Sequence, residues 1–388
     1  MLPILGADLI LADYDTLQIK FLMGGKFTTL QGDNDKLSET TQLHHIRSMV
    51  NTKAIAEVYN MQIVQEKSIP ISLLELPDDM EPELALLLHT YSSVFSTPSS
   101  LPPPRSHVHH IPLLTGSNPV KVKPYRYPHS QKEEIEKLVE NILREGIIQH
   151  SSNPFSSPII LVKKKDGSWR VCTDYRALNA ITIKDSFPIP TVDELIDELY
   201  GACYFSKLDL RFGYHQILLN PEDRHKIAFR THQDLYEWLV MPFGLSNAPA
   251  TFQSLMNQIF NGMLRKFVLV FFDNIQVYSI NWKDHLQHIE MVLNILKNNQ
   301  LFAKISKCTF GVQQINYLGH TLSGDGVTME VEKLEVVENW AKPSNLKQLR
   351  GFLGLTGYYR HFVKGYANIA APLTDLLKKD SFKWSDTT

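Results

Sequence analysis

Two aspartates and an asparagine occupy positions suited to holding a cation. Asp209 falls near the end of the predicted strand Phe205–Leu210. Asp273 falls in the turn of an apolar hairpin predicted over 267–279, and Asn274 follows it directly. Carboxylate oxygens from adjacent strands of one sheet are the hard ligands that Mg²⁺ prefers. Taken singly, each aspartate is better explained as a turn or capping residue, because Asp and Asn are common in tight turns.

Basic residues in a predicted two-stranded hairpin are candidates for binding phosphate. The strands are Ser157–Val162 and Trp169–Asp174, and the turn between them contains the Asp-Gly pair typical of hairpins. Lys164 lies at this turn and Arg170 follows it; a lysine point charge and an arginine fork both suit phosphate oxygens. From composition alone, the run 163–165 is more simply a solvated charge cluster.

The rest of the pattern predicts strands and helices mixed along the chain. Capping boxes at Ser130–Glu133 and Thr191–Glu194 predict two helix starts, and Gly146 stands where the first helix should end. Such a mixture predicts an α+β fold with a mostly antiparallel sheet and helices on one face. The other predicted elements are a helix over 248–264, a helix through 289 and 296, a strand pair around 317–320, and helices continuing to about 379.

Composition sets the broad class of the chain. Its 388 residues are enough for two or three domains, and 43% hydrophobic with 21% charged residues is ordinary for a globular protein. The formal net charge of −2 gives no sign of a nucleic-acid partner. No apolar run approaches the length of a membrane span, and the apolar start carries Asp8 without a basic leader, which argues against a signal peptide.

The cysteines point to a reducing compartment. There are three of them, widely separated, so they form neither a disulfide framework nor a metal-ligand spacing. They are Cys172, Cys203 and Cys308.

Basic and aromatic residues alternate near the end of the chain. Between Ala341 and Thr374 there are five basic residues and no acidic one. Such a stretch suits the binding of nucleic-acid phosphates. A solvated helix face over an aromatic core explains the pattern equally well. The basic residues are Lys342, Lys347, Arg350, Arg360 and Lys364, and the aromatic residues among them are Phe352, Tyr358, Tyr359, Phe362 and Tyr366.

Four sequence blocks carry a family resemblance. They are Trp169–Asn179, Phe205–Ile217, Met241–Gln253 and the hairpin 267–279. In type and order they resemble the blocks of reverse transcriptases of gypsy-class LTR retrotransposons, and the resemblance extends from about 102 to 384. Together the blocks are highly specific. The resemblance implies a fingers–palm–thumb polymerase fold with an antiparallel palm sheet, preceded by a short β fragment.

The resemblance implies a two-metal polymerase site. Asp209 and Asp273 match the metal ligands of the family, and Asn274 occupies its next catalytic position. The expected cofactor is Mg²⁺, with Mn²⁺ as a substitute, because joining a nucleotide to a primer needs two divalent metals.

Other site residues are matched to substrate contacts. Lys164 and Arg170 match residues that embrace the incoming triphosphate. Tyr214 matches the aromatic that stacks under the sugar and excludes a ribose 2′-OH; the alternative for it is a core aromatic. Phe243 and Gly244 match the loop beneath the templating base pair, where glycine lets the backbone approach nucleic acid, and 317–320 resembles the grip on the primer end.

Several residues depart from the family pattern. Asn274 stands where the family has a second aspartate, so one negative charge is missing. Gln276 places an amide where an apolar residue is usual, Phe212 replaces a small residue, and Val331 replaces a proline. These departures predict impaired polymerisation, and together they are typical of drift in an unselected copy.

The start of the chain resembles a different enzyme. The segment Ile4–Asp8 looks like the closing segment of a retropepsin, but no Asp-Thr/Ser-Gly triplet occurs, so no protease activity is expected. The predicted division is a C-terminal protease remnant over 1–32, a linker over 33–101, fingers and palm over 102–320, and over 321–388 a thumb with the start of a connection to an RNase H domain that lies outside this sequence.

The predicted function is that of a retrotransposon RNA-directed DNA polymerase impaired by Asn274. Its expected partners are an RNA or DNA template with a primer and deoxynucleoside triphosphates, without a membrane, and a homodimer is left open. The expected place is the cytoplasm, in a virus-like particle, with the nucleus as the alternative. Two other functional hypotheses remain: an inactive template–primer-binding relic, and a fragment that never folds stably.

Overall fold

The chain forms two compact units, residues 1–96 and 97–388. The computed structural model describes residues 7–13, 18–23, 26–31, 74–77, 79–163, 167, 169–378 and 382–384. In the first unit, three strands form an antiparallel sheet in the order β1-β2-β3, which confirms the strands predicted at the start of the chain. The elements of this unit are β1 (Ala7–Asp13), β2 (Gln18–Met23), β3 (Lys26–Gln31), α2 (Pro82–Thr90) and the 3₁₀ helix η2 (Ser92–Phe95).

The second unit contains three sheets, and their strand pairs are antiparallel except for β5 with β8. Their orders are β4-β9-β8-β5-β6, β10-β11-β7-β12 and β13-β14-β15. The strands are β4 (Ile148–His150), β5 (Ser157–Lys163), β6 (Trp169–Thr173), β7 (Tyr204–Asp209), β8 (Phe229–Arg230), β9 (Leu235–Trp238), β10 (Val268–Phe271), β11 (Asn274–Ser279), β12 (Thr309–Val312), β13 (Gln314–Tyr317), β14 (His320–Ser323) and β15 (Gly326–Met329).

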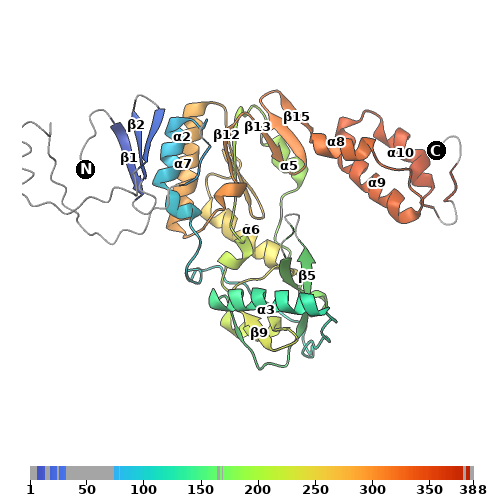
Figure 1. Cartoon of the computed structure of the whole chain (residues 1–388). Helices are drawn as coiled ribbons and strands as arrows, with labels where there is room; N and C mark the ends of the chain where they lie inside the picture. The colour runs from blue at the N-terminus through green and yellow to red at the C-terminus, as the bar shows by residue number, and fades with distance from the viewer. Residues whose placement is uncertain are drawn as a thin grey trace, which may run out of the picture. The chain divides into compact units, whose positions relative to one another are not determined.

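Helices alternate with these strands, and the last three, α8 to α10, gather in one group near the C-terminus (Figure 1). The mixture is the predicted α+β fold. None of the helices within the described ranges has the length and apolar character needed to span a bilayer. The helices are α3 (His129–Arg144), α4 (Arg176–Ile181), α5 (Val192–Asp197), α6 (Ala248–Ile259), α7 (Trp282–Asn298), α8 (Val331–Glu338), α9 (Leu346–Tyr358) and α10 (Tyr366–Asp375), with 3₁₀ helices η3 (Gly213–Gln216), η4 (Pro221–Ile227), η5 (Ile305–Lys307) and η6 (Arg360–Phe362).

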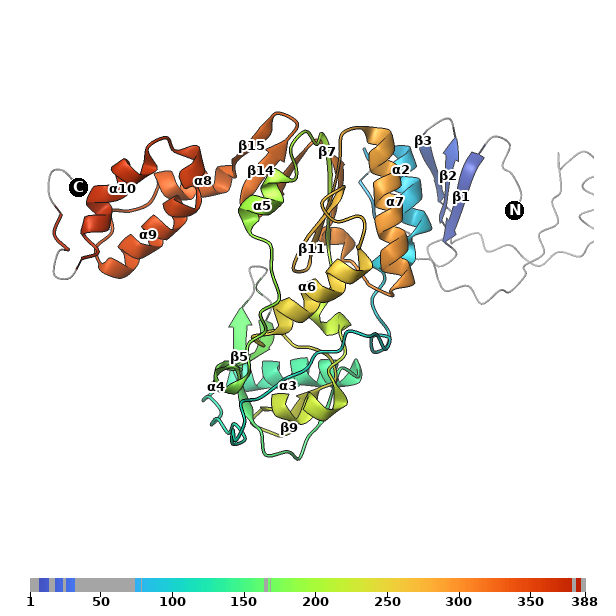
Figure 2. The ribbon, with the colours of Figure 1, turned by 180° about the vertical axis from the view of Figure 1, so that it is seen from behind.

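The four-stranded sheet has two different faces, because side chains alternate along each strand. One face packs against α7, which runs along β11 (Figure 2). Helix α7 begins at the N-cap Asn281, which accepts a hydrogen bond from the backbone N of Asp284 at 2.9 Å. The other face holds a core shared with α5 and with the β13–β14 hairpin, so the prediction that helices cover only one face of the sheet is wrong. Its buried residues are Leu195, Leu199, Ala202, Phe205, Leu269, Tyr278, Ile315, Tyr317 and Leu322.

Of the two capping boxes predicted from the sequence, one is correct and one is wrong. The capping box at Thr191 is confirmed, since Thr191 and Glu194 exchange side chain–backbone hydrogen bonds. The box predicted at Ser130 is wrong, because α3 begins at His129, with Pro128 as its N-cap. The fixed φ of proline already suits this position, so the chain enters the helix one residue before the predicted cap. Gly146 has a φ of 71° just after α3, as expected for a helix end.

The segment that follows the triple proline Pro102–Pro104 is part of the folded unit. Segment 105–113 runs beside the strand-like residues near 218, and the backbone N of His109 donates to the carbonyl of Leu218 at 2.9 Å. The Arg105 guanidinium donates to the carbonyl of Gln216 at 2.5 Å. These long-range hydrogen bonds join the segment to the 3₁₀ helix that ends at Gln216 and to Leu218 just beyond it, so the folded unit includes residues that precede α3.

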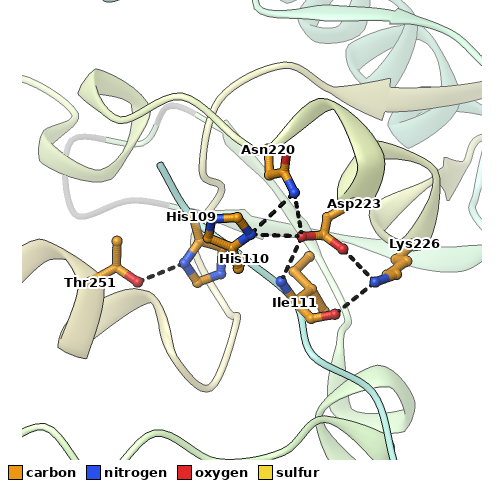
Figure 3. A network of polar contacts seen from close by, with 7 residues as sticks. All are labelled: His109, His110, Ile111, Asn220, Asp223, Lys226 and Thr251. Carbon is orange, nitrogen blue, oxygen red and sulfur yellow. Dashed lines mark hydrogen bonds and ion pairs between the residues drawn. The ribbon is translucent and has the colours of Figure 1, made fainter. Parts of the chain in front are cut away.

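A buried carboxylate holds this segment in place (Figure 3). Asp223 accepts hydrogen bonds from the backbone N of Ile111 at 3.1 Å, from Asn220 at 3.3 Å, and from the ammonium of Lys226. Lys226 also donates to the carbonyl of Ile111 at 2.9 Å. Burial raises the pKa of Asp223, but the hydrogen bonds from Lys226 and Ile111 outweigh this effect, and the pKa lies below its usual value. Asp223 is therefore a charged anchor between segment 105–113 and η4.

Replacing Asp223 by asparagine should destabilise the folded unit. Asp223→Asn removes a buried charge that is hydrogen-bonded on three sides, so we expect the free energy of unfolding at pH 7 to fall by about 2–4 kcal/mol in urea titrations. A depressed carboxyl pKa stabilises the fold above the unfolded pKa, and this contribution is lost as pH falls through the folded pKa. The difference between the two proteins should therefore shrink below about pH 4.

Asp375 provides a matched control. It forms the same i,i+3 pair with a lysine, Lys378, at 2.7 Å, but both side chains are mostly exposed. Asp375→Asn should change stability by less than about 0.5 kcal/mol. Equal effects of the two substitutions would show that Asp223 is an ordinary surface carboxylate and not an anchor.

Candidate active site

The structure brings the predicted metal-binding residues together at one end of the four-stranded sheet. Asp209 ends β7, and β11 pairs with β7 in antiparallel register so that Asn274 lies directly opposite Asp209. Asp273 lies in the two-residue turn that joins β10 to β11. The backbone N of Leu210 donates to the carbonyl of Asp273 at 3.0 Å, which ties the end of β7 to this turn. The three side chains therefore meet at one point of the fold.

The charges at this point are only partly balanced. Burial raises the pKa of Asp273, and the negative charge of Asp209 raises it further. Lys307, at the end of η5, lies with its ammonium 3.4 Å from a carboxylate oxygen of Asp209 and acts in the opposite direction. Sequence reasoning missed Lys307, because a single lysine in a loop gives no signal. Two close carboxylates facing one lysine make a place where added positive charge is stabilised.

A buried histidine fixes the strands that carry these residues. His285 of α7 is fully buried, and its two ring nitrogens lie 2.8 Å from the hydroxyl of Ser206 and 2.9 Å from that of Ser279. The Ser206 hydroxyl also accepts from the backbone N of Gly311 at 2.8 Å. Burial lowers the pKa of His285 to about 4, so the ring is neutral at pH 7 and one nitrogen donates while the other accepts. The ring thereby links β7, β11 and β12 to α7.

Backbone strain flanks both aspartates. Phe272, which precedes Asp273 in the turn, has a φ of 53°, and Phe212, three residues after Asp209, has a φ of 47°. A bulky side chain rarely adopts the left-handed region, and such residues cost about 1–3 kcal/mol each. Strain of this kind clusters at functional sites, where surrounding contacts hold it in place.

A second hairpin places the positively charged side chain of Arg170 near Asp273. Strands β5 and β6 pair so that Arg170 lies opposite Val162. The guanidinium of Arg170 lies 4.2 Å from the centre of the Phe243 ring. Its positive charge offsets part of the rise in the pKa of Asp273. Lys164, the other predicted phosphate contact, lies outside the described residues.

Tyr214 packs against the turn that carries Asp273. Its ring lies 4.8 Å from that of Phe243 and 5.4 Å from that of Phe252. Burial raises the pKa of Tyr214 to about 12, with a further contribution from the charge of Asp273. The preceding Gly213 is closely packed, because a Cβ there would lie 3.1 Å from the Cβ of Asp273 and would force a small shift of its neighbours. Tyr214 therefore lies among aromatic rings and close enough to Asp273 to sense its charge.

The loop of Phe243 and Gly244 is held by an asparagine that the sequence did not single out. Asn179 donates to the carbonyl of Gly244 at 2.8 Å and accepts from the backbone N of Ser246 at 2.9 Å. Asn179 is the last residue of the block 169–179, and its place in this family-matched block was the one sign in the sequence that it could be functional. These hydrogen bonds place Phe243 under Arg170 and beside Tyr214.

The donor atoms at the sheet end suit a hard divalent cation. Two carboxylates and one amide oxygen are the ligand types that Mg²⁺ prefers. Across residues 74–384, leaving out the few positions there that the structure does not describe, no group of three or more His, Cys, Asp or Glu side chains is arranged to hold a metal. Asp209 and Asp273 could hold a divalent cation through two carboxylates, and the amide oxygen of Asn274 is the neutral donor next to them.

A family model decides the class of this site. Residues 162–322 match the model described as "Reverse transcriptase (RNA-dependent DNA polymerase)". This chain carries a reverse transcriptase domain. The matched residues include β6 with Arg170, both aspartates and the β13–β14 turn. The reverse transcriptase part of the resemblance inferred from the sequence blocks is thus confirmed, and its assignment to the gypsy class stays a prediction.

Curated relatives of this reverse transcriptase domain are retrotransposon polyproteins. The chain is 41% identical over 277 residues to the retrovirus-related Pol polyprotein from transposon 297 of Drosophila melanogaster, covering 70% of the chain. It is 33% identical over 363 residues to the transposon Tf2-7 polyprotein of Schizosaccharomyces pombe, covering 93% of the chain. In each case the match spans 26% of the relative's own length.

Solved structures agree on the fold. The foamy viral protease-reverse transcriptase in complex with dsDNA gives a TM-score of 0.71 at 23% identity, covering 80% of this chain and 66% of that one. The same protein in complex with an RNA/DNA hybrid gives 0.70 at 21% identity, covering 100% of this chain and 53% of that one. The reverse transcriptase polymerase fold expected from the sequence is therefore present.

One residue inside the domain is poorly accommodated. Gln276 shares a sheet face with Asn274, and its side chain is fully buried. Its amide nitrogen donates to the carbonyl of Val277 at 3.2 Å, but its amide oxygen has no hydrogen-bond partner within the described residues. A buried acceptor left unpaired costs about 1–3 kcal/mol.

Replacing Gln276 by leucine should stabilise the domain. Gln276→Leu removes the unpaired oxygen at similar volume, so we expect the free energy of unfolding to rise by about 1–2 kcal/mol, seen as a melting temperature higher by roughly 2–6 °C. Gln216→Leu is the control, because Gln216 is also buried but makes hydrogen bonds with Arg211 and Phe302 through both amide atoms. That variant should lose stability. Destabilisation by both substitutions would contradict the assignment of Gln276 as an unpaired group.

Proposed function

We propose that this domain adds deoxynucleotides to the 3′ end of a primer under the direction of a template, releasing pyrophosphate. The observation that carries the proposal is the meeting of Asp209, Asp273 and Asn274 at the end of β7 and β11, within the span that matches the reverse transcriptase family. Because the chain spans about a quarter of the length of its curated relatives, the activity of the whole polyprotein is not ascribed to it.

The proposed partners are a template–primer duplex and deoxynucleoside triphosphates. The foamy viral structures, which share the fold, contain dsDNA and an RNA/DNA hybrid. The basic stretch near the C-terminus supports the same class of partner, since its five cations are all exposed and so free to meet phosphates. These cations are Lys342, Lys347, Arg350, Arg360 and Lys364.

The proposed cofactor is Mg²⁺, with Mn²⁺ as a substitute, held by Asp209 and Asp273 with the amide oxygen of Asn274. When bound, a divalent cation neutralises charge on the triphosphate and on the attacking 3′ oxygen. Lys307 limits repulsion between the two carboxylates, as its 3.4 Å contact with Asp209 indicates. Acidic side chains here must be ionised to bind a cation, so the raised pKa of Asp273 predicts weaker metal binding as pH falls.

The remaining site residues are proposed to orient the nucleotide. Arg170, with Lys164, binds the triphosphate as a fixed fork beside the carboxylates. Tyr214 lies under the sugar and excludes a 2′-OH by its ring, which Phe243 and Phe252 hold in place. The loop of Phe243 and Gly244 supports the templating base pair.

Asn274 is the weak point of the proposed site. Relative to aspartate it removes one negative charge about 4 Å from a cation, which at an effective dielectric of about 20 is worth up to ~4 kcal/mol. A second candidate function follows from this observation, namely a template–primer-binding relic that keeps the fold without catalysis. The unpaired Gln276 favours this alternative, because it adds a second departure close to the metal-binding strand.

We also propose an origin for the chain. The agreement with transposon polyproteins supports a gypsy-class Gag-Pol source, in which residues 1–32 are the tail of a retropepsin-like protease and 321–388 are the thumb. The strands β1 to β3 support the first part of this division and helices α8 to α10 the second. The free thiols of Cys172, Cys203 and Cys308 support a reducing compartment, in keeping with a cytoplasmic virus-like particle.

Restoring the missing charge tests the proposed function. In primer-extension assays with Mg²⁺, the natural chain should extend a primer very slowly and more readily with Mn²⁺. Asn274→Asp should raise the rate by roughly 10²–10³, which corresponds to about 3–4 kcal/mol of transition-state stabilisation. Template–primer affinity should remain unchanged in the same preparation, because the basic residues that bind phosphates are untouched.

The matched control is the same substitution at the opposite end of β11. Asn281 is the N-cap of α7, where aspartate caps as well as asparagine, so Asn281→Asp adds a charge away from the site. It should leave the extension rate within about twofold. If Asn274→Asp binds template–primer but remains inactive, the relic hypothesis replaces the polymerase proposal.

A further inference from the structure

The turn between β13 and β14 is joined to the C-terminal helices by two adjacent tyrosines. Leu318 and Gly319 form this two-residue turn with φ values of 50° and 82°, the geometry of a mirror-image hairpin turn. The Tyr358 hydroxyl donates to the carbonyl of Leu318 at 2.8 Å, and the Tyr359 hydroxyl donates to that of Gly319 at 2.9 Å. Turn carbonyls of this kind usually face water, so their capture by two consecutive side chains is a specific arrangement.

The fit around Gly319 is close. A Cβ on this residue would lie 2.8 Å from the hydroxyl oxygen of Tyr359, so glycine is required by space as well as by its positive φ. Tyr359 is 3% exposed, whereas Tyr358 is 42% exposed. The hydroxyl of Tyr358 is therefore held at the surface without contributing to a buried core, and stability alone does not account for its position.

His320 completes the contact from the strand side. It is buried, and its ring lies 5.4 Å from each of the rings of Tyr358 and Tyr359 and 5.7 Å from that of Phe362. Its Nδ1 lies 3.1 Å from the carbonyl of Leu318, which thus has two partners. The helices and the hairpin turn are connected by directional bonds and by a packed ring cluster, so they are expected to move as one body.

We propose that Tyr358 and Tyr359 form a clasp that positions the primer end by fixing the 318–319 turn to the helices that bind duplex phosphates. The proposal rests on the proposed function, since it assumes that the turn contacts a primer. Helix α9, which ends at Tyr358, also carries the exposed cations Lys347 and Arg350. A duplex held by these cations thereby keeps a fixed position relative to the 318–319 turn. Both tyrosines are positioning residues rather than catalytic ones.

The test compares hydroxyl deletions. Tyr358→Phe and Tyr359→Phe each remove one hydrogen bond and keep the ring. We expect each to speed dissociation of a labelled template–primer roughly fivefold, and the double variant roughly 20-fold, in stopped-flow measurements with an unlabelled trap. A fluorescent base analogue at the primer 3′ end should report a changed environment in the same variants. The melting temperature of Tyr358→Phe should stay within roughly 1 °C, since this hydroxyl is at the surface.

Tyr366→Phe is the matched control. Its hydroxyl lies 2.8 Å from that of Thr356, inside the same group of helices, and does not reach the hairpin. It should leave dissociation and the primer-end signal unchanged. If the natural chain binds template–primer and the double variant dissociates at the same rate, the clasp is refuted while the proposed function stands. If the natural chain does not bind template–primer, the proposed function fails and the clasp with it.

Discussion

The antiparallel register between β7 and β11 is the constraint on which the candidate site depends. It places Asn274 opposite Asp209 and leaves Asp273 in the adjoining turn. A slip of one residue would turn every side chain of β11 to the other face of the sheet. The buried link from Ser206 through His285 to Ser279 prevents such a slip, because only one register lets both hydroxyls reach the same imidazole.

The grouped negative charges that would suit this site for metal binding are unfavourable for folding when no cation is bound. Burial raises the pKa of Asp273, and repulsion from the nearby charge of Asp209 raises it further, so the two carboxylates are unfavourable neighbours without a cation. Lys307 relieves part of this repulsion at Asp209. Asparagine at 274 avoids adding a third negative charge to the pair, so it should favour the metal-free fold while weakening the hold on a cation. Under the proposed function, this balance predicts a stable protein that binds template–primer but catalyses nucleotide addition slowly.

Local sequence signals predicted the parts of the fold that depend on local interactions. Asp209 was placed near a strand end and Asp273 in a hairpin turn because apolar runs and turn residues surround them, and the capping box at Thr191 formed as expected. The box at Ser130 did not form, since Pro128 began the helix earlier. Segment 105–113 gave no local signal, because its ordering comes from distant partners such as Asp223, which no local pattern reveals.

The same limit applies to the candidate site. Arg170, Tyr214 and the Phe243 loop were found through matched blocks, and their contacts place them beside Asp273. Lys307 and His285 were missed, because each belongs to a stretch whose composition is that of an ordinary loop or helix. Their importance arises only when η5 and α7 are folded onto β7, so it follows from tertiary structure and not from residue type.

The most direct test of the account is to locate a divalent cation in crystals of the chain grown with template–primer and Mn²⁺. Anomalous scattering would identify the metal without reference to activity, so an impaired enzyme serves as well as an active one. The account predicts a peak between the carboxylates of Asp209 and Asp273, and its loss in Asp209→Ala crystals. A peak bound elsewhere, or one that persists unchanged in the Asp209→Ala variant, would contradict the assignment of these residues as the metal site.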